Sequence, residues 1–202
     1  MSEHYYSNRP SVEHQEKEFV FELRDQSLKF ITDAGVFSRD RIDYGSVLLI
    51  EEMQIQPKDE VLDMGCGYGP IGLVAARLAS KGKVWMADVN ERAVTLAQRN
   101  AERNGIHNVE IMTSFLFENL PDQKYDVILT NPPIRAGKQT VHQIFEEAYP
   151  RLKDTGSLWI VIQKKQGGPS AMSKLQEIYQ KVEKVVQDKG YWIIKATRLD
   201  HL

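Results

Sequence analysis

The sequence predicts an α/β fold built on an open, twisted, mostly parallel sheet with helices on its faces. Two observations predict it. From residue 44 onward, apolar runs of strand length alternate with segments of helical periodicity, which is the pattern of βαβ units joined by right-handed crossovers. A glycine-rich stretch, 65–72, connects the first of these strands to a helix. Ligands of such sheets bind beyond the carboxyl ends of the strands, so we expect functional side chains in the loops that follow them.

The amino-terminal residues, 1–43, are polar and rich in aromatic side chains. Residues 18–23 alternate apolar and charged side chains, which is the period of a half-buried strand. A second apolar run, 28–32, follows after a four-residue turn. We therefore expect a small β-hairpin extension over 1–43, which forms part of the same domain as the α/β body over 44–202.

Each element of the α/β body has its own signal. Pro70 stands near the first turn of one helix, where a missing N–H has no consequence, and Asn90 and Gly105 cap and stop the next helix. Pro150 has to kink or shorten the helix that contains it. Residues 188–190 suit the turn of a closing hairpin, which makes the far edge of the sheet antiparallel. The expected helices are 44–53, 70–80, 90–104, 139–152 and 170–179, and the expected strands are 60–64, 83–88, 109–113, 125–130, 157–163, 182–187 and 191–197.

Composition limits the class of protein. The 202 residues are 42% hydrophobic and 27% charged, which fits one globular domain and excludes disorder over most of the chain. Lys and Arg number 26 against 28 Asp and Glu, so a uniformly basic nucleic-acid binder is excluded. The balance is uneven along the chain: residues 1–130 hold 14 basic and 21 acidic residues, whereas 131–202 hold 12 and 7. The composition therefore does not exclude a local basic face that binds RNA.

Several absences shape the remaining expectations. A single cysteine, Cys66, excludes an internal disulfide and a thiolate cluster, and the five histidines include no pair at ligand spacing, so we expect no metal. The first ten residues include no apolar core of a signal peptide, and no apolar run approaches the roughly 20 residues of a membrane helix. We expect a monomeric cytoplasmic protein without membrane contact.

The glycine loop carries the first chemical signal. The run Gly67-x-Gly69-x-x-Gly72 matches the dinucleotide fingerprint, but a tight strand–helix turn would explain it equally well. Asp63, at the strand end, makes the pattern more specific, because a carboxylate there suits an ammonium and not a pyrophosphate. The pattern Asp63-x-Gly65-x-Gly67-x-Gly69 resembles motif I of class I S-adenosylmethionine-dependent methyltransferases, whose fold is Rossmann-like. The resemblance implies that the loop binds the methionine part of S-adenosylmethionine and that Asp63 faces its amino group.

The ends of the next two strands complete the expected cofactor site. Asp88 offers two acceptor oxygens to the hydroxyls of a ribose, a device that NAD enzymes share. A simple helix-capping role just before Asn90 is the competing interpretation of Asp88. Ser114 and Phe115 follow the third strand, where the family resemblance implies contact with adenine.

A second motif follows the fourth strand. Asn131-Pro132-Pro133-Ile134 resembles the Asn/Asp-Pro-Pro-aromatic motif IV of amino-methyltransferases. An exocyclic amine is a poor nucleophile, and two acceptors, the Asn131 side-chain oxygen and the Pro132 carbonyl, would hold its two N–H groups and aim its lone pair. Ile134 replaces the usual aromatic residue, so stacking on a base has to come from elsewhere. Tyr5, Tyr6 and Phe37 are the aromatic candidates.

The front segment narrows the resemblance to a subfamily. Segments of the catalytic domain of small-subunit ribosomal RNA guanine-N2 methyltransferases resemble residues 4–10, 32–46 and 131–138. The resemblance extends over nearly the whole chain. The resemblance implies methylation of a guanine N2 amine in ribosomal RNA or in an assembling small subunit, with Gly45 over the cofactor. Two-domain members carry a further amino-terminal half that these 202 residues do not contain. The candidate substrate contacts are Tyr6, Phe37, Arg135, Lys138, Lys164 and Lys165.

Simpler roles and other functions compete with this hypothesis. Tyr5 and Tyr6 could have a packing role alone, and Asp43 could be a helix cap and nothing more. Lys164 and Lys165 could equally be two solvated surface lysines. A methyltransferase for a protein glutamine or a small-molecule amine is an alternative, although those of release factors carry Tyr after Asn-Pro-Pro. An NAD-dependent oxidoreductase would leave Asp63 and Asn131 without a role. A non-catalytic RNA-binding or assembly module is disfavoured by the intact set of motif residues.

Overall fold

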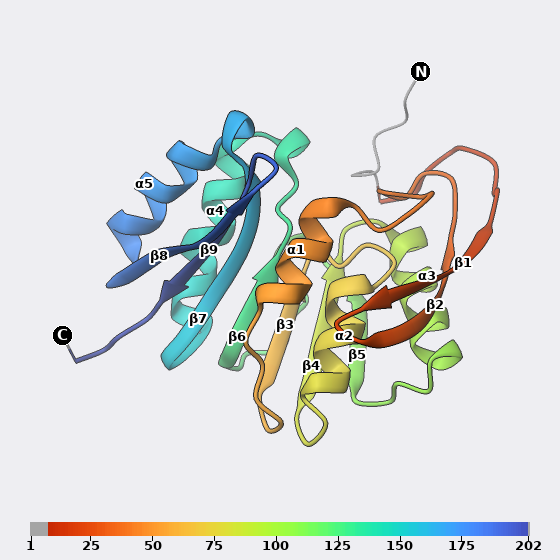
Figure 1. Cartoon of the computed structure of the whole chain (residues 1–202), viewed down its shortest axis with the longest axis horizontal. Helices are drawn as coiled ribbons and strands as arrows, with labels where there is room; N and C mark the ends of the chain where they lie inside the picture. Colours follow the sequence, from red (N-terminus) through yellow and green to blue (C-terminus); the bar gives the residue numbers. More distant parts are fainter. Residues whose placement is uncertain (1–7, 202) are drawn as a thin grey trace.

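The computed structural model describes residues 8–201 and contains a seven-stranded sheet with helices on both faces (Figure 1). The strand order is β5-β4-β3-β6-β7-β9-β8, in which all neighbours from β5 to β7 are parallel and β9 is antiparallel to both β7 and β8. The strands of this sheet are β3 (Glu60–Met64), β4 (Lys83–Asp88), β5 (Val109–Thr113), β6 (Tyr125–Thr130), β7 (Leu152–Gln163), β8 (Lys181–Asp188) and β9 (Tyr191–Thr197). The parallel sheet and the antiparallel closing hairpin predicted from the sequence are confirmed.

Two apolar layers enclose the sheet because successive strand residues point to opposite faces. On one face, Val61, Met86 and Leu129 pack against the first three helices, and on the other, Leu62 and Ile128 pack against the last two. The first three helices are α1 (Tyr44–Glu52), α2 (Pro70–Leu78) and α3 (Glu91–Arg103), and the last two are α4 (Lys138–Ala148) and α5 (Gly168–Ile178). The crossover helices therefore leave the carboxyl ends of the parallel strands open to a ligand.

The front segment forms a separate two-stranded antiparallel sheet of β1 (Lys17–Leu23) and β2 (Gln26–Thr32). This hairpin lies beside α3 in Figure 1. Phe30 and Ile31 of β2 are buried in the same apolar cluster as Leu96 of α3 and Leu49 of α1. The hairpin thus extends one of the two cores of the α/β body.

The greatest departure from the sequence prediction lies between α4 and β7. The helix expected over 139–152 ends at Ala148, and Tyr149–Arg151 form a 3₁₀ turn with Pro150 in its first positions. The strand expected over 157–163 begins at Leu152, which pairs with Tyr125 before a register shift. Gly156 lies in this irregular stretch, where an added Cβ would meet the carbonyl oxygen of Lys153 at 2.9 Å. The proline ends the helix, and the glycine permits close strand contact beyond it.

Within residues 8–201, no helix combines the length and the apolar character needed to cross a membrane.

Candidate active site

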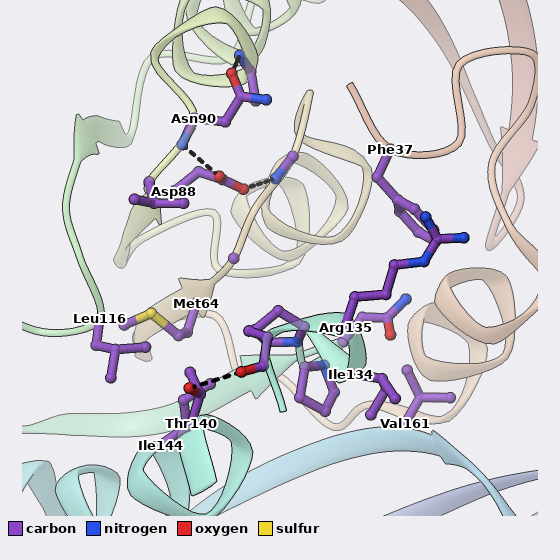
Figure 2. A pocket seen from close by; sticks show the side chains of 18 of the residues that line it. Phe37, Met64, Asp88, Asn90, Leu116, Ile134, Arg135, Thr140, Ile144 and Val161 are labelled. Atoms are coloured by element: carbon purple, nitrogen blue, oxygen red, sulfur yellow. Dashed lines mark hydrogen bonds between the residues drawn. The ribbon is translucent and has the colours of Figure 1, made fainter. Parts of the chain in front are cut away.

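A cavity of about 590 Å³ opens beyond the carboxyl ends of the parallel strands (Figure 2). Asp88 ends β4, Ser114 follows β5, Asn131 follows β6 and Gln163 ends β7, and all four line the cavity wall. The structure therefore brings together side chains that are far apart in the sequence. The predicted site residues on this wall are Phe37, Gly65, Gly67, Asp88, Ser114, Phe115, Asn131, Pro132, Pro133, Ile134 and Arg135.

The glycine loop presents bare backbone to the cavity. Gly65 and Gly67 have φ of 75° and 55°, a conformation that favours glycine. A Cβ added at either residue would meet no other protein atom within 4 Å, so both backbones face open space. The N–H groups of Gly65 and Cys66 donate to the Ala87 carbonyl, which fixes the loop against β4. Burial raises the pKa of the Cys66 thiol, which is therefore unsuited to act as a nucleophile.

Asp88 holds the glycine loop and the start of α3 together. Its Oδ2 accepts the Gly67 N–H at 2.8 Å, and its Oδ1 accepts the Asn90 N–H at 2.9 Å (Figure 2). The competing interpretation of Asp88 as the helix cap is wrong, because Asn90 caps α3 with its own side chain, and the Asp88 carboxylate lies on the cavity wall. Burial raises the pKa of Asp88, although the backbone donors oppose that shift.

Asp63 lies beneath the glycine loop and off the cavity wall. Its side chain is fully buried, with Oδ2 accepting the Gly72 N–H at 2.8 Å. Within the described residues, Oδ1 has no hydrogen-bond partner. Burial raises the pKa of Asp63 to about 7. Gly69, the residue before α2, also lies off the wall.

Ser114 and Phe115 contribute differently to the wall. The Ser114 hydroxyl donates to the Leu116 carbonyl at 2.8 Å and accepts the Asn119 N–H, so it holds its own loop together. The Phe115 ring is 48% exposed, and Leu116 lies beside Met64 in Figure 2. This end of the cavity is therefore apolar, next to the carboxylate of Asp88.

The Asn131 turn supplies acceptors at another part of the wall. The Pro133 carbonyl accepts the Ala136 N–H at 2.9 Å within the 3₁₀ turn Ile134–Ala136, whereas that turn does not use the Pro132 carbonyl. The Asn131 Nδ2 donates to Asp43 Oδ2 at 3.2 Å and to Ser46 Oγ at 3.1 Å. The amide nitrogen of Asn131 is thus directed to the start of α1.

Gly45 lies off the cavity wall, against the ring of Tyr191. A Cβ at Gly45 would approach Tyr191 Cε1 to 2.8 Å, so the glycine permits this aromatic ring to pack on α1. Tyr191 does line the cavity, and its Oη accepts the Gln163 Nε2 at 2.8 Å.

The described candidate substrate contacts are spread around the mouth of the cavity, and we call the four cations Arg135, Lys138, Lys164 and Lys165 the basic rim. Arg135 is exposed on the wall and lies close to Phe37, which is 44% exposed (Figure 2). The other three cations, Lys138, Lys164 and Lys165, are exposed beyond the wall, at the start of α4 and in the 3₁₀ turn that follows β7. Tyr5 and Tyr6 lie outside the described residues.

Sequence reasoning missed several wall residues. The polar ones include Asn8, Asn90, Thr140, Gln163, Gln166 and Tyr191, and the apolar ones include Val36, Met64, Val89, Leu116, Ile144 and Val161. The position of Gln163 and Gln166 could have indicated them, because Gln163 ends β7 and Gln166 lies in the turn that follows, at the sheet edge where Asn131 follows β6. The apolar residues carry no local signal that separates them from ordinary core. In the described part of the chain, no group of three or more His, Cys, Asp or Glu side chains is arranged to hold a metal ion.

Together, the strand order, the glycine loop and Asp88 at one cavity define a class I S-adenosylmethionine-dependent methyltransferase. The model of the methyltransferase small domain family matches residues 27–195. The chain belongs to this family.

Individual relatives agree with the assignment. YbxB of Bacillus subtilis (strain 168), described as uncharacterized, is 52% identical in an alignment of 202 positions that covers 98% of this chain and 100% of YbxB. Ribosomal RNA small subunit methyltransferase C of Serratia proteamaculans (strain 568) is 37% identical to this chain over an alignment that covers 59% of this chain and 33% of the relative. The enzyme of Ectopseudomonas mendocina (strain ymp) is 32% identical, covering 71% and 44%. This chain thus matches less than half the length of these two relatives.

Among solved structures, a T. thermophilus 16S rRNA N2 methyltransferase, RsmC, in complex with AdoMet and guanosine, has a TM-score of 0.83. It is 23% identical and covers 94% of this chain, while this chain covers 52% of it. The match shows a shared fold.

Proposed function

We propose that this protein transfers a methyl group from S-adenosylmethionine to the N2 amine of a guanine in small-subunit ribosomal RNA. One observation carries the proposal: the acceptor-rich turn at Asn131 and Pro132 lines the same cavity as the glycine loop and Asp88. The relatives named ribosomal RNA small subunit methyltransferase C, and the T. thermophilus structure with its bound guanosine, support the choice of an RNA guanine.

The residues of the cavity fit the cofactor of the family. The bare backbones at Gly65 and Gly67 leave room for the methionine part, and the Asp88 carboxylate suits the ribose hydroxyls. Phe115 and Leu116 offer an apolar surface for adenine next to Asp88. When bound, S-adenosylmethionine supplies an activated methyl group, so the protein needs to orient the acceptor and not to activate the donor.

Asn131 and Pro132 have the chemistry to orient an amine. The lone pair of a guanine N2 amine is delocalised into the ring, which makes the amine a weak nucleophile. Oxygen acceptors on both N–H groups, the Asn131 Oδ1 and the Pro132 carbonyl, would fix the direction of that lone pair. The stiff Pro132-Pro133 backbone keeps these acceptors in position without reorganisation.

Binding of the base and of the RNA backbone involves different parts of the site. Ile134 gives the base an apolar contact, and the exposed Phe37 ring, near Arg135, offers a stacking surface. The cations Arg135, Lys138, Lys164 and Lys165 suit phosphates around the cavity mouth.

Radiolabelled methyl transfer tests the proposal directly. Ribosomal RNA and 30S particles from cells that lack this protein are incubated with the purified chain and tritiated S-adenosylmethionine, and the RNA is digested to nucleosides. We expect label in N2-methylguanosine with wild-type protein and a loss of at least 100-fold with Asn131→Ala. Label in a protein fraction with unlabelled RNA would favour the glutamine-methyltransferase alternative, and RNA binding without any transfer would favour a non-catalytic module.

A further inference from the structure

The amide of Asn131 is held in one orientation by the start of α1. Its Nδ2 lies 3.2 Å from Asp43 Oδ2 and 3.1 Å from Ser46 Oγ, although these residues are 88 and 85 positions away in the sequence. Ser46 is buried and Asp43 is half-buried. Asp43 and Asn131 both line the cavity, so the contact lies at the wall of the site.

The chemistry of the partner determines which end of the amide faces it. A carboxylate oxygen only accepts hydrogen bonds, so it selects the NH₂ end of Asn131 and repels the oxygen. Asp43 itself has little freedom, because it is the N-cap of α1. Its Oδ2 also accepts the Ser46 N–H at 3.1 Å, and its carbonyl accepts the Val47 N–H at 3.1 Å. The start of α1 therefore holds the amide of Asn131 in a fixed orientation.

We propose that Asp43 and Ser46 are positioning residues for methyl transfer, which hold the Asn131 NH₂ group and thereby turn its Oδ1 toward the acceptor amine. This inference rests on the proposed role of Asn131 as an acceptor. It assigns a function in the reaction to an aspartate that would otherwise serve only as a helix cap.

A purely structural role for Asp43 makes a different prediction. Glycine at an N-cap costs little stability, so Asp43→Gly largely keeps the start of α1. The substitution removes the Oδ2 that accepts the Asn131 NH₂ group, so the amide of Asn131 loses its fixed orientation. We expect D43G to keep the melting temperature within a few degrees and the affinity for S-adenosylmethionine while lowering kcat about tenfold. Unchanged kcat would reduce Asp43 to a cap.

Creating and then relieving a charge repulsion between positions 43 and 131 gives the sharpest test. Asn131→Asp alone sets two carboxylates against each other and should lower kcat about 100-fold. The double variant D43N/N131D replaces one of the two carboxylates by a neutral amide and retains an oxygen at position 131, so we expect at least a tenfold recovery over N131D. The matched control, N131D/D154N, removes an exposed carboxylate at the opposite edge of the sheet and should recover nothing. Thermal melts and calorimetry with S-adenosylmethionine verify that each variant folds.

A carboxyl titration tests the contact without any acceptor substrate. In ¹³C-labelled N131D, the introduced carboxyl should have its pKa raised by Asp43, and in D43N/N131D the pKa should fall by at least one pH unit. Arg135 and Tyr191 line the same cavity and are common to both variants, so the difference reports on position 43. Equal pKa values, or no recovery of kcat in D43N/N131D, would overturn the proposal. If wild-type protein methylates no guanine, the proposed function fails, and the titration still decides whether Asp43 orients position 131.

Discussion

At the residue scale, two neighbouring aspartates of the sheet edge serve different purposes. Asp88 lies on the cavity wall, and each of its oxygens accepts one backbone N–H. Asp63 is sealed beneath the glycine loop with one oxygen unpartnered among the described residues. A carboxylate oxygen has more than one acceptor site, so Asp88 retains capacity for a ribose while it holds the loop. Asp63 instead forms part of the floor beneath the loop.

Removing the Asp88 carboxylate should weaken cofactor binding and leave the chemical step largely intact. Asp88→Ala removes the proposed ribose acceptor and also releases the Gly67 N–H, so the loop loses one of the hydrogen bonds that fix its shape. We expect the Kd for S-adenosylmethionine, measured by calorimetry, to rise at least tenfold, which corresponds to about 1.4 kcal/mol. At saturating cofactor, kcat should stay within a few-fold. The matched comparison is Asn131→Ala, whose Kd should not change; equal Kd values for the two variants would contradict the assignment.

The raised pKa of Asp63 predicts that the stability of the ligand-free protein falls as the pH rises toward neutral. Its pKa is about 7 in the fold and near its ordinary value, 3.8, in the unfolded chain. Between these values the folded protein binds one more proton than the unfolded chain, so stability falls as pH rises through this window. We expect the free energy of unfolding in urea to fall by about 2 kcal/mol between pH 5 and 7.5 through this group.

The comparison of slopes isolates the contribution of Asp63. Asp63→Asn cannot titrate, so its stability should fall less steeply over the same pH range, whatever its absolute stability. Part of the slope should remain, because burial also raises the pKa of Asp88. Identical slopes in wild type and D63N would show that Asp63 is already ionised in the fold near pH 5.

At the element scale, α3 joins the front hairpin to the α/β body. Asn100 of α3 is fully buried, accepts the Ile31 N–H at 2.7 Å, and donates to the carbonyls of Ile31 and Tyr68. One amide thus satisfies the backbone of β2 and of the residue before Gly69. This bridge and the shared apolar cluster support our proposal that residues 1–43 form one domain with 44–202.

Truncating this bridge should destabilise the protein well beyond the average surface substitution. Asn100→Ala leaves a buried N–H and two buried carbonyls unpaired, and we expect a loss of about 3 kcal/mol in the free energy of unfolding. Asn104, one turn later, makes the same pair of bonds to the N–H and carbonyl of the exposed Lys29. Water replaces those bonds in Asn104→Ala, so its loss should stay below about 1 kcal/mol. Equal losses in urea titrations would contradict the bridge.

Elements were predictable where the signal is local, and contacts were not. Periodicity identified the strands over 60–64, 83–88, 109–113 and 125–130 with the bounds that the structure has. Pro150 indicated a disturbed helix end, but the early start of β7 depends on pairing with Tyr125, which no local pattern encodes. The contact of Asn131 with Asp43 depends on the same long-range packing. The family resemblance implied that Gly45 lies over the cofactor, whereas in the structure the absence of a Cβ at Gly45 leaves room for the ring of Tyr191.

At the scale of the whole molecule, the basic residues after position 130 include some that are paired with carboxylates and some that are exposed near the cavity. The excess of basic residues after position 130 includes Lys174 and Lys153, but both are neutralised: Lys174 pairs with Glu146, and Lys153 pairs with Glu60 and Asp126. Lys164 and Lys165 are exposed in the 3₁₀ turn that follows β7, at the same sheet edge as the cavity. The mild net charge of −2 therefore coexists with a basic rim suited to RNA phosphates.

Charge reversal on that rim should weaken RNA binding in a salt-dependent way. We expect K164E/K165E to lower the affinity for small-subunit ribosomal RNA at least tenfold near 100 mM salt, and to flatten the dependence of log Kd on log salt by about one or two, because each lost phosphate contact removes about one released counterion. The control K58E/K81E makes the same change of charge in loops at the opposite sheet edge. Since net charge alone would affect both variants equally, a matching loss in the control would show that RNA senses the overall field and not the rim of the active site.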